Sequence, residues 1–594
     1  MDNPSRSIDK PIASVGGEIW GSDAVAAMLR KLEIPYLALN PGSSFRGLHD
    51  SIVNHLGNAQ PQMLLCLHEE HAVAIAHGYA KVTNRPMGVI LHSNVGLMHA
   101  TMAIYNAWCD RVPMLVIGAT GPVDAARRRP WIDWLHTARD QGALVRPYIK
   151  WDDQPASVPA SLESLLRAVN LTRAAPMAPT YVCLDVSMQE QRLEAMPPFP
   201  DPKRHAAPST SVPPSGDIAA AAELLDGAKT PLLLLGRLSR DPQDWARRVA
   251  LAERLGARVL TDIKVGAVFP TDHELHAGKP GYFLDEAGAR CIREADVIVA
   301  FDWADLAGTL AQAGDIDARV INVTLDHHLH NGWSMDHQAL PPADLHLGGD
   351  PDLALHLIAD ELGTGTGSVP NSLPALPALR LDGPPRELDV ASLAAAMGEV
   401  LRDEVVSLVR LPLGWTGDSW HFRHPLDYLG SDGGAGVGSG PGMLIGAALA
   451  LKGSGRIPVA VLGDGDMMMS ASALWTAAHY QLPLLAIVLN NRSFYNDEIH
   501  QERVARTRGR PVENKWIGMK ICDPDIDIAA VARAQGLTGI GPVSTTDQLV
   551  AAVREGSAAV KTGASVVIDA RVKPGYNPTM AAGMTRDGPA AAEA

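Results

Sequence analysis

Short apolar runs that alternate with helical patterns are the feature that most constrains how this chain can fold. Between residues 20 and 190 the apolar runs are MGVIL (87–91), VPMLVIGA (112–119) and TYVCLDV (180–186). Such runs are typical of strands buried in a parallel sheet, with helices as their connections. The pattern predicts an α/β fold whose functional residues lie in loops beyond the carboxyl ends of the strands.

The same alternation continues in two further blocks, set apart by segments rich in Pro, Ser and Gly at residues 196–215 and 363–385. Neither segment can sustain a helix or a strand ladder, so both are interpreted as linkers. We therefore predict three doubly wound parallel-sheet domains at 15–192, 216–362 and 388–575, with a tail at 576–594 that is unstructured in isolation. The strands expected in the second and third domains are TPLLLLG, ARVLTD, ADVIVAFD, ARVINVT, IPVAVLGDGD, LPLLAIVLNN and ASVVIDARV.

Size and charge narrow the classes of function. A chain of 594 residues exceeds one hydrophobic core, and 46% apolar with 20% charged residues is ordinary for a globular protein. The formal net charge of −15, without a long basic block, argues against nucleic acid or an anionic membrane surface as a partner. A small-molecule substrate is the better expectation.

Cysteine usage and the N-terminal segment indicate the compartment. The five cysteines are scattered and lack CxxC spacing, so we expect them to be reduced. The N-terminal segment is polar, and no uninterrupted apolar run approaches the length of about 18 residues expected of a membrane span. We therefore expect a cytoplasmic protein that is neither secreted nor membrane-spanning.

The segment VAVLGDGDMMMSASALWTAAHYQLPLLAIVLNN (459–491) carries the most specific chemical signal. One apolar strand runs into Gly463, Asp464 and Gly465, and the next ends in a pair of asparagines that closes with Asn491. Neighbouring strand ends lie side by side in a parallel sheet, so Asp464 and Asn491 are expected to converge. Their oxygens suit Mg²⁺ or Ca²⁺, and the glycines with the following helix N-terminus suit a phosphate. The segment predicts a diphosphate bridged to the protein by a divalent cation.

The GDG triplet has three simpler interpretations. Taken alone, it is a common turn. An EF-hand is excluded because Asp464 and Asp466 lack the remaining spaced ligands, and a dinucleotide fingerprint because GxGxxG is not completed. The specific signal is the pair of GDG and a second strand ending about 27 positions later.

The stretch HEEHAVAIAHGYAK (68–81) places three histidines and two carboxylates on an alanine-rich helix. The zinc motif HExxH needs histidines four apart, whereas His68 and His71 are three apart, so zinc is not expected. Glu70, His71 and His77 are expected to be solvated polar groups. The interspersed alanines predict close helix packing, as expected against a partner subunit.

Together these two stretches resemble the thiamine diphosphate-dependent decarboxylase and acetohydroxyacid synthase superfamily. GDG followed by NN matches its cofactor site, and Glu69, Ala72 and the GYA at 78–80 match its pattern ExxAxxxxxGYA. The resemblance implies pyrimidine-binding, central and diphosphate-binding domains, in that order. It also implies active sites built between subunits, and hence a homodimer or homotetramer.

The resemblance assigns the cofactor-binding residues. Asp464, the Asn491 side chain and the Ser493 backbone carbonyl would hold Mg²⁺, with Gly463, Gly465 and Asp466 beside the diphosphate. Asp466 stands where the superfamily carries Ser or Ala, and it would repel the anion unless it turns away or reaches a cation. Val437, in GGAGVGSGPG, matches the residue that wedges the cofactor into its bent shape.

By its register in this pattern, Glu69 is the residue for which the resemblance implies the role of catalytic acid. The aminopyrimidine of the cofactor needs an acid at N1′ so that its amino group can become an imine and deprotonate thiazolium C2. A carboxyl that is partly removed from water can hold or share that proton near neutral pH.

Three further residues are candidates for substrate handling. NPGS and LHS are similar to benzoylformate decarboxylases, whose Ser and His there match Ser43 and His92. Ser43 could bind a substrate carboxylate or only shape a turn, and His92 could exchange protons or only cap a strand end. Asp497 matches a catalytic glutamate of pyruvate decarboxylases. The basic segments 127–137 and 503–510 suggest a lid or rim and an anion contact, without an assigned chemistry.

The resulting expectation is cleavage or formation of a C–C bond next to a carbonyl, with thiamine diphosphate and Mg²⁺. The expected reaction is decarboxylation of a 2-oxo acid, with or without carboligation as in acetolactate synthases. A 2-hydroxyacyl-CoA lyase, a benzoin-type aldehyde lyase acting on a 2-hydroxy carbonyl compound, and a non-catalytic cofactor-binding paralogue remain alternatives. Acetohydroxyacid synthases hold FAD in the central domain and usually carry the stretch RFDDR there. FAD is not expected here, because the corresponding AFDWADL (300–306) lacks the arginine.

Overall fold

The computed structural model describes residues 8–12, 17–207, 210–326, 340–363, 387–576 and 578–585. Two compact units form. Unit 1 comprises 1–209, 432–452 and 470–482, and unit 2 comprises 210–431, 453–469 and 483–594. Most of the predicted linker at 363–385 and the end of the tail lie outside the described residues.

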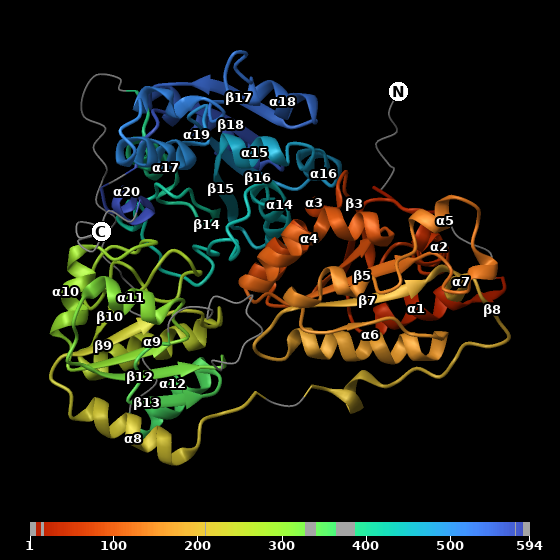
Figure 1. The fold of residues 1–594 in the computed structure, drawn as a ribbon, viewed down its shortest axis with the longest axis horizontal. Helices are drawn as coiled ribbons and strands as arrows, with labels where there is room; N and C mark the ends of the chain where they lie inside the picture. Colours follow the sequence, from red (N-terminus) through yellow and green to blue (C-terminus); the bar gives the residue numbers. More distant parts are fainter. Residues whose placement is uncertain are drawn as a thin grey trace. The chain divides into compact units, whose positions relative to one another are not determined.

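Unit 1 is built on a six-stranded parallel sheet in the order β3-β2-β4-β5-β7-β6. Helices α1 and α6 cover one face, and α3 and α4 cover the other (Figure 1). Its strands are β1 (Ile19–Trp20), β2 (Tyr36–Leu39), β3 (Gln62–Leu65), β4 (Met87–Leu91), β5 (Met114–Thr120), β6 (Asp152–Asp153), β7 (Pro179–Asp185) and β8 (Arg192–Leu193), of which β1 and β8 form a separate antiparallel pair. Its helices are α1 (Gly21–Lys31), α2 (Arg46–Asp50), α3 (Glu69–Thr83), α4 (Ser93–Cys109), α5 (Ile132–Leu135), α6 (Val158–Arg173), α7 (Val186–Gln189), α14 (Gly440–Leu451) and α16 (Ala473–His479).

Unit 2 contains two five-stranded parallel sheets, in the orders β10-β9-β11-β12-β13 and β14-β15-β16-β18-β17. The strands are β9 (Pro231–Leu235), β10 (Arg258–Leu260), β11 (Val297–Phe301), β12 (Arg319–Thr324), β13 (Leu345–Gly348), β14 (Val406–Arg410), β15 (Ile457–Gly463), β16 (Leu484–Asn490), β17 (Thr538–Val543) and β18 (Ser565–Arg571). The helices are α8 (Ser215–Asp226), α9 (Pro242–Leu255), α10 (Glu286–Glu294), α11 (Leu306–Ala313), α12 (Pro351–Glu361), α13 (Val390–Leu401), α15 (Asp464–Met469), α17 (Tyr495–Thr507), α18 (Ile528–Ala534), α19 (Thr546–Lys561) and α20 (Pro578–Thr585).

The prediction of three parallel-sheet α/β domains is confirmed, and each apolar run expected to be a strand forms one. Part of the tail, which is expected to be unstructured in isolation, forms α20 in the folded chain. Met580 on this helix is buried, and Gly583 lies so close to Phe283 that an added Cβ would come within 2.4 Å of its ring. Packing against the rest of unit 2 orders a segment that has little helical signal of its own. Within the described residues, no helix is both long and apolar enough to cross a membrane.

Helices α3 and α14 pack with their backbones in near contact. A Cβ on Gly78 would lie 2.0 Å from the Met443 carbonyl oxygen, and one on Gly446 would lie 1.9 Å from that of Ile75. Only residues without a side chain allow this approach, which explains the small residues at this face. The close packing expected from the alanines is therefore met by α14 of the same chain.

The position of α3 corrects the expectation that His71 and His77 face water. Both side chains are buried, because the sheet side and α14 leave this part of the helix little access to solvent. His77 Nε2 lies 2.7 Å from Asp110 Oδ2, and the buried Lys81 ammonium binds the same carboxylate. Glu70 is half-buried.

Burial of His71 predicts a loss of stability in acid. Burial, and then the neighbouring His68, lower the pKa of His71 from 6.5 to about 4. The unfolded chain therefore binds a proton at pH values where folded His71 stays neutral. The free energy of unfolding is therefore unaffected by His71 above pH 6.5. It decreases as the pH falls toward 4, by about 3 kcal/mol in total.

His71→Leu removes this titration and keeps a buried side chain of similar bulk. Denaturant unfolding at several pH values should give a free energy of unfolding that falls less steeply between pH 6.5 and 4 than in the unmodified protein. If the free energy of unfolding depends on pH in the same way in both proteins, the lowered pKa of His71 is contradicted.

Candidate functional site

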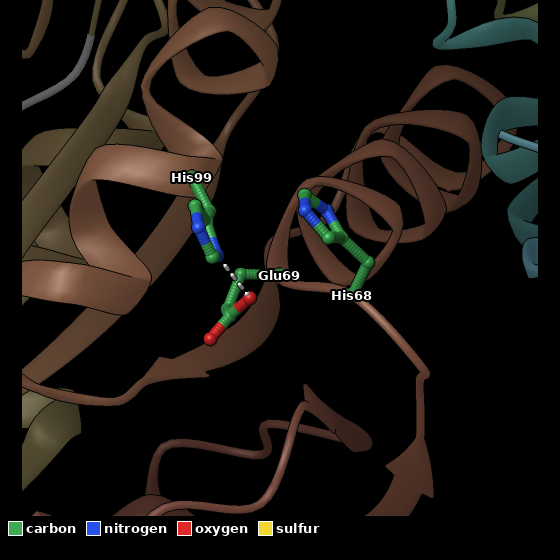
Figure 2. Close-up of side chains that lie close together, drawn as sticks. All are labelled: His68, Glu69 and His99. Carbon is green, nitrogen blue, oxygen red and sulfur yellow. Dashed lines mark hydrogen bonds and ion pairs between the residues drawn. The ribbon is translucent and has the colours of Figure 1, made fainter. Parts of the chain in front are cut away.

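Glu69 is the first residue of α3 and follows the carboxyl end of β3. Its side chain is buried, and His68 caps the helix by accepting a hydrogen bond from the Glu70 backbone N–H, at 3.2 Å. Glu69 Oε2 lies 3.0 Å from Nδ1 of His99, which comes from α4 (Figure 2). A buried carboxyl with one fixed partner is thus held at a strand-to-helix junction.

His99 is a site residue that the sequence did not reveal. It lies 30 positions from Glu69 along the chain, and no motif marks it. Its ring stacks on that of His68, with centroids 4.9 Å apart. One ligand atom from each of His68, Glu69 and His99 lies within 4.8 Å of the others, so this group could also hold a metal ion.

His92 sits at the N-terminus of α4 and contacts Ser44. His92 Nδ1 and Ser44 Oγ are 2.9 Å apart, and the Ser93 backbone N–H donates to the same hydroxyl at 3.1 Å. Gly42 allows this approach, since a Cβ there would lie 2.3 Å from the His92 side chain. Ser43, the predicted substrate residue, is exposed instead, and its carbonyl accepts a hydrogen bond from Arg46 at 2.9 Å.

His92 is biased toward its neutral form. Burial, and then the electrostatic effect of the neighbouring His136, lower the pKa of His92, and Glu69 opposes the shift. The rings of His92 and His136 meet edge to face, with centroids 4.8 Å apart. A neutral imidazole near Glu69 can accept or pass on a proton.

His136 belongs to the basic and aromatic segment 127–137, and no sequence motif predicts a role for it. Arg129 and the buried Asp133 pair at 2.8 Å within this segment, whereas Trp131 and Trp134 are 71% and 75% exposed. The segment therefore brings one imidazole to His92 and presents two indole rings to solvent.

Val437 lies in a loop whose backbone is bound by the side chain of Asn106. The buried Asn106 amide accepts a hydrogen bond from the Gly436 N–H at 3.2 Å and donates one to the Gly436 carbonyl at 3.4 Å. Asp432 accepts a further hydrogen bond from the Ala435 N–H, at 2.9 Å. The Val437 side chain is 43% exposed.

In unit 2, Asp464 begins α15 directly after β15, and Asn491 follows the adjacent strand β16. Asp464 Oδ1 accepts a hydrogen bond from the Gly465 N–H at 2.9 Å. Burial raises the pKa of Asp464 to about 6, against the hydrogen bonds that the backbone of Gly465, Arg492 and Ser493 provides. Asp464 and the 491–493 loop are thus in contact, as parallel neighbouring strands require.

Two oxygens at this loop are notable. Asp464 Oδ2 is buried and has no hydrogen-bond partner among the described residues. Asn491 Oδ1 accepts a hydrogen bond from the Ser493 N–H at 2.9 Å. One buried carboxylate oxygen is therefore uncompensated, which is costly without a cation or a proton.

Asp466 reaches a cation, which is one of the two outcomes expected for it. Its Oδ2 lies 3.8 Å from Nε of Arg410, and both side chains are largely buried. Gly465 packs against Phe494, where a Cβ would come within 2.6 Å of the ring, whereas the space beside Gly463 is open.

Two adjacent acids on the helix after this loop, Asp497 and Glu498, lie in different environments. Glu498 is buried and accepts a hydrogen bond from the Ser493 hydroxyl, whereas Asp497 is exposed. Of the arginines in 503–510, Arg506 pairs with Glu502 at 2.6 Å. Sequence spacing could not separate the two adjacent acids, because their difference depends on how α17 is rotated.

The predicted site residues therefore form two groups. Glu69, His92 and Val437 belong to unit 1, whereas Asp464 and Asn491 belong to unit 2. In each group the residues lie just after the carboxyl ends of strands, except Val437, which lies in a loop.

Three domain families match the chain in order and cover most of it. They are "Thiamine pyrophosphate enzyme, N-terminal TPP binding domain" at residues 19–144, the central domain of the same enzymes at 218–355, and their C-terminal TPP binding domain at 412–570. The first contains Glu69, and the third contains Asp464 and Asn491.

Whole proteins show the same relationship. A benzoylformate decarboxylase of Pseudomonas aeruginosa is 26% identical over 84% of this chain and 89% of its own length. An acetolactate synthase of Bacillus subtilis is 24% identical over 93% of each chain. The structure of a thiamine diphosphate-dependent 4-hydroxybenzoylformate decarboxylase of Rhodococcus jostii RHA1 shares the fold, with a TM-score of 0.73 at 22% identity over 94% of this chain and 100% of that one. With all three domains matched in order, this chain belongs to the thiamine pyrophosphate enzymes.

Proposed function

We propose that this protein uses thiamine diphosphate and Mg²⁺ to cleave or form a C–C bond next to a carbonyl. The observation that carries the proposal is the buried Glu69 carboxyl at the start of α3, in the register of the family motif. Decarboxylation of a 2-oxo acid, with or without carboligation, is the favoured reaction. Relatives named as a benzoylformate decarboxylase and an acetolactate synthase support this choice.

The residues present in unit 2 fit a magnesium ion. Asp464 offers a buried oxygen without a hydrogen-bond partner among the described residues, and the Asn491 side chain lies on the loop that contacts it. A hard cation would compensate the desolvated carboxylate and bind oxygen donors of this kind. We propose Asp464, the Asn491 side chain and the Ser493 carbonyl as its protein ligands.

The chain's own groups account for proton handling. Bound thiamine diphosphate supplies a nucleophilic carbon and an electron sink. Glu69 offers a carboxyl largely withdrawn from water, and the neutral His92 imidazole, aligned by Ser44, can accept or return a proton. Ser43 and Asp497 are proposed for substrate contacts, and Val437 for shaping the cofactor pocket.

The function is tested with a panel of 2-oxo acids, each supplied with and without an aldehyde acceptor. We expect at least one acid to release CO₂ in a reaction that requires both thiamine diphosphate and Mg²⁺. Measuring ligated product in parallel separates decarboxylation from carboligation, and CoA thioesters and benzoin-type substrates test the lyase alternatives. Turnover of those compounds alone would contradict the favoured reaction.

Glu69→Gln should leave cofactor binding within about threefold and slow hydrogen–deuterium exchange at cofactor C2 by at least about a hundredfold, the scale of general acid–base catalysis. NMR after acid quench measures the exchange. Glu70→Gln, one position away and half-buried, is the matched control and should exchange at the unmodified rate. Equal rates in both variants would remove Glu69 from its assigned role.

Asp464→Ala should abolish Mg²⁺-dependent retention of thiamine diphosphate, because it removes the buried oxygen donor. Cofactor content after dialysis, with and without a chelator, provides the measurement. Asp497→Asn, at an exposed position, should retain the cofactor normally. Full retention by Asp464→Ala would contradict the proposed diphosphate site.

A further inference from the structure

We propose that His99 is a positioning residue for Glu69, and that its hydrogen bond to Oε2 orients the carboxyl so that Oε1 is presented to the cofactor. The inference rests on the proposed function, since it assumes that Glu69 activates the cofactor. It concerns a residue that no motif marks and that reaches Glu69 from a different helix.

The two carboxyl oxygens of Glu69 contact different residues of one turn of α4. His99 binds Oε2 at 3.0 Å, whereas Gly96, three positions earlier on the same helix face, lies beside Oε1. A Cβ at Gly96 would come within 3.0 Å of Oε1 and 3.2 Å of Cγ. The missing side chain therefore leaves room at Oε1, while the imidazole holds Oε2.

The His99 ring is itself oriented by a neighbour. It stacks on His68 with an interplanar angle of 20°, and His68 is held in turn by the hydrogen bond from the Glu70 N–H. Figure 2 shows both rings beside the Glu69 carboxyl, with His99 on the neighbouring helix. A ring fixed by stacking can hold a hydrogen bond with little further loss of rotamer freedom.

The protonation of the group is compatible with this role. Burial, and then the electrostatic effect of His99, lower the pKa of His68, which disfavours a charged His68 beside Glu69. His99 Nδ1–H can donate to the carboxylate, and the same nitrogen can accept from the carboxylic acid in the other tautomer. The His99 side chain is 57% exposed, so solvent can exchange its proton while Glu69 stays buried.

The test compares His99→Asn with His99→Leu. Asparagine places an amide nitrogen close to the position of Nδ1 and can still donate to Oε2, whereas leucine cannot. We expect His99→Leu to slow cofactor C2 exchange at least about tenfold with thiamine diphosphate affinity within about threefold. His99→Asn should recover the rate to within about threefold. His55→Leu, an exposed histidine of unit 1, controls for the substitution itself.

Unchanged exchange in His99→Leu, or a loss that His99→Asn does not recover, would overturn the inference. Glu69→Gln distinguishes this failure from that of the proposed function: if Glu69→Gln also exchanges normally, the role of Glu69 itself is lost. If Glu69→Gln stops exchange while His99→Leu does not, only the positioning role fails.

The apoprotein gives a readout that needs no turnover. With ¹⁵N-labelled histidine, the resonance that disappears in His99→Asn should change its ¹⁵N chemical shift in Glu69→Gln, because the Nδ1–Oε2 contact is altered. An unchanged chemical shift would show that the pair does not form in solution. This measurement also covers the case in which His99→Leu fails to fold.

Discussion

The shared direction of the strands in each main sheet is the constraint on which the rest of the structure depends. In a parallel sheet every strand ends at the same edge, so the residues that follow the strands gather there. Glu69 follows β3 and His92 follows β4 in unit 1, while Asp464 follows β15 and Asn491 follows β16 in unit 2. The apolar strands form the rigid support, and these four polar side chains are placed at its edge.

Burial at these junctions produces the electrostatic properties of the candidate site. Asp464 has lost water around one oxygen without gaining a hydrogen-bond partner among the described residues, and burial raises its pKa to about 6. Glu69 is equally withdrawn from water, but an imidazole compensates one of its oxygens. The first arrangement favours a cation, and the second favours a carboxyl with one defined orientation.

The small residues of α3 and α14 allow close packing around the helix that carries Glu69 in unit 1. Contact between the two backbones at Gly78 and Gly446 encloses the helix that starts at Glu69. The same enclosure buries His71 and His77, which lie on that helix and would otherwise titrate in water. A helix with polar side chains on its buried faces is tolerated because Asp110 pairs with His77 and Lys81.

The sequence by itself determined the α/β class and the position of the strands, and the register against Ala72 and Gly78 singles out Glu69 as the proposed acid. These features depend on the spacing of residues close together in the sequence, which can be read without knowing the tertiary structure. Only the tertiary structure decided that Ser44 rather than Ser43 contacts His92, that Glu498 rather than Asp497 is buried beside Ser493, and that His71 and His77 lose their solvent. It also brought His99 to Glu69 and His136 to His92. The reason is that rotation about a helix axis and contacts between distant segments depend on how whole elements pack, which no single stretch of residues encodes.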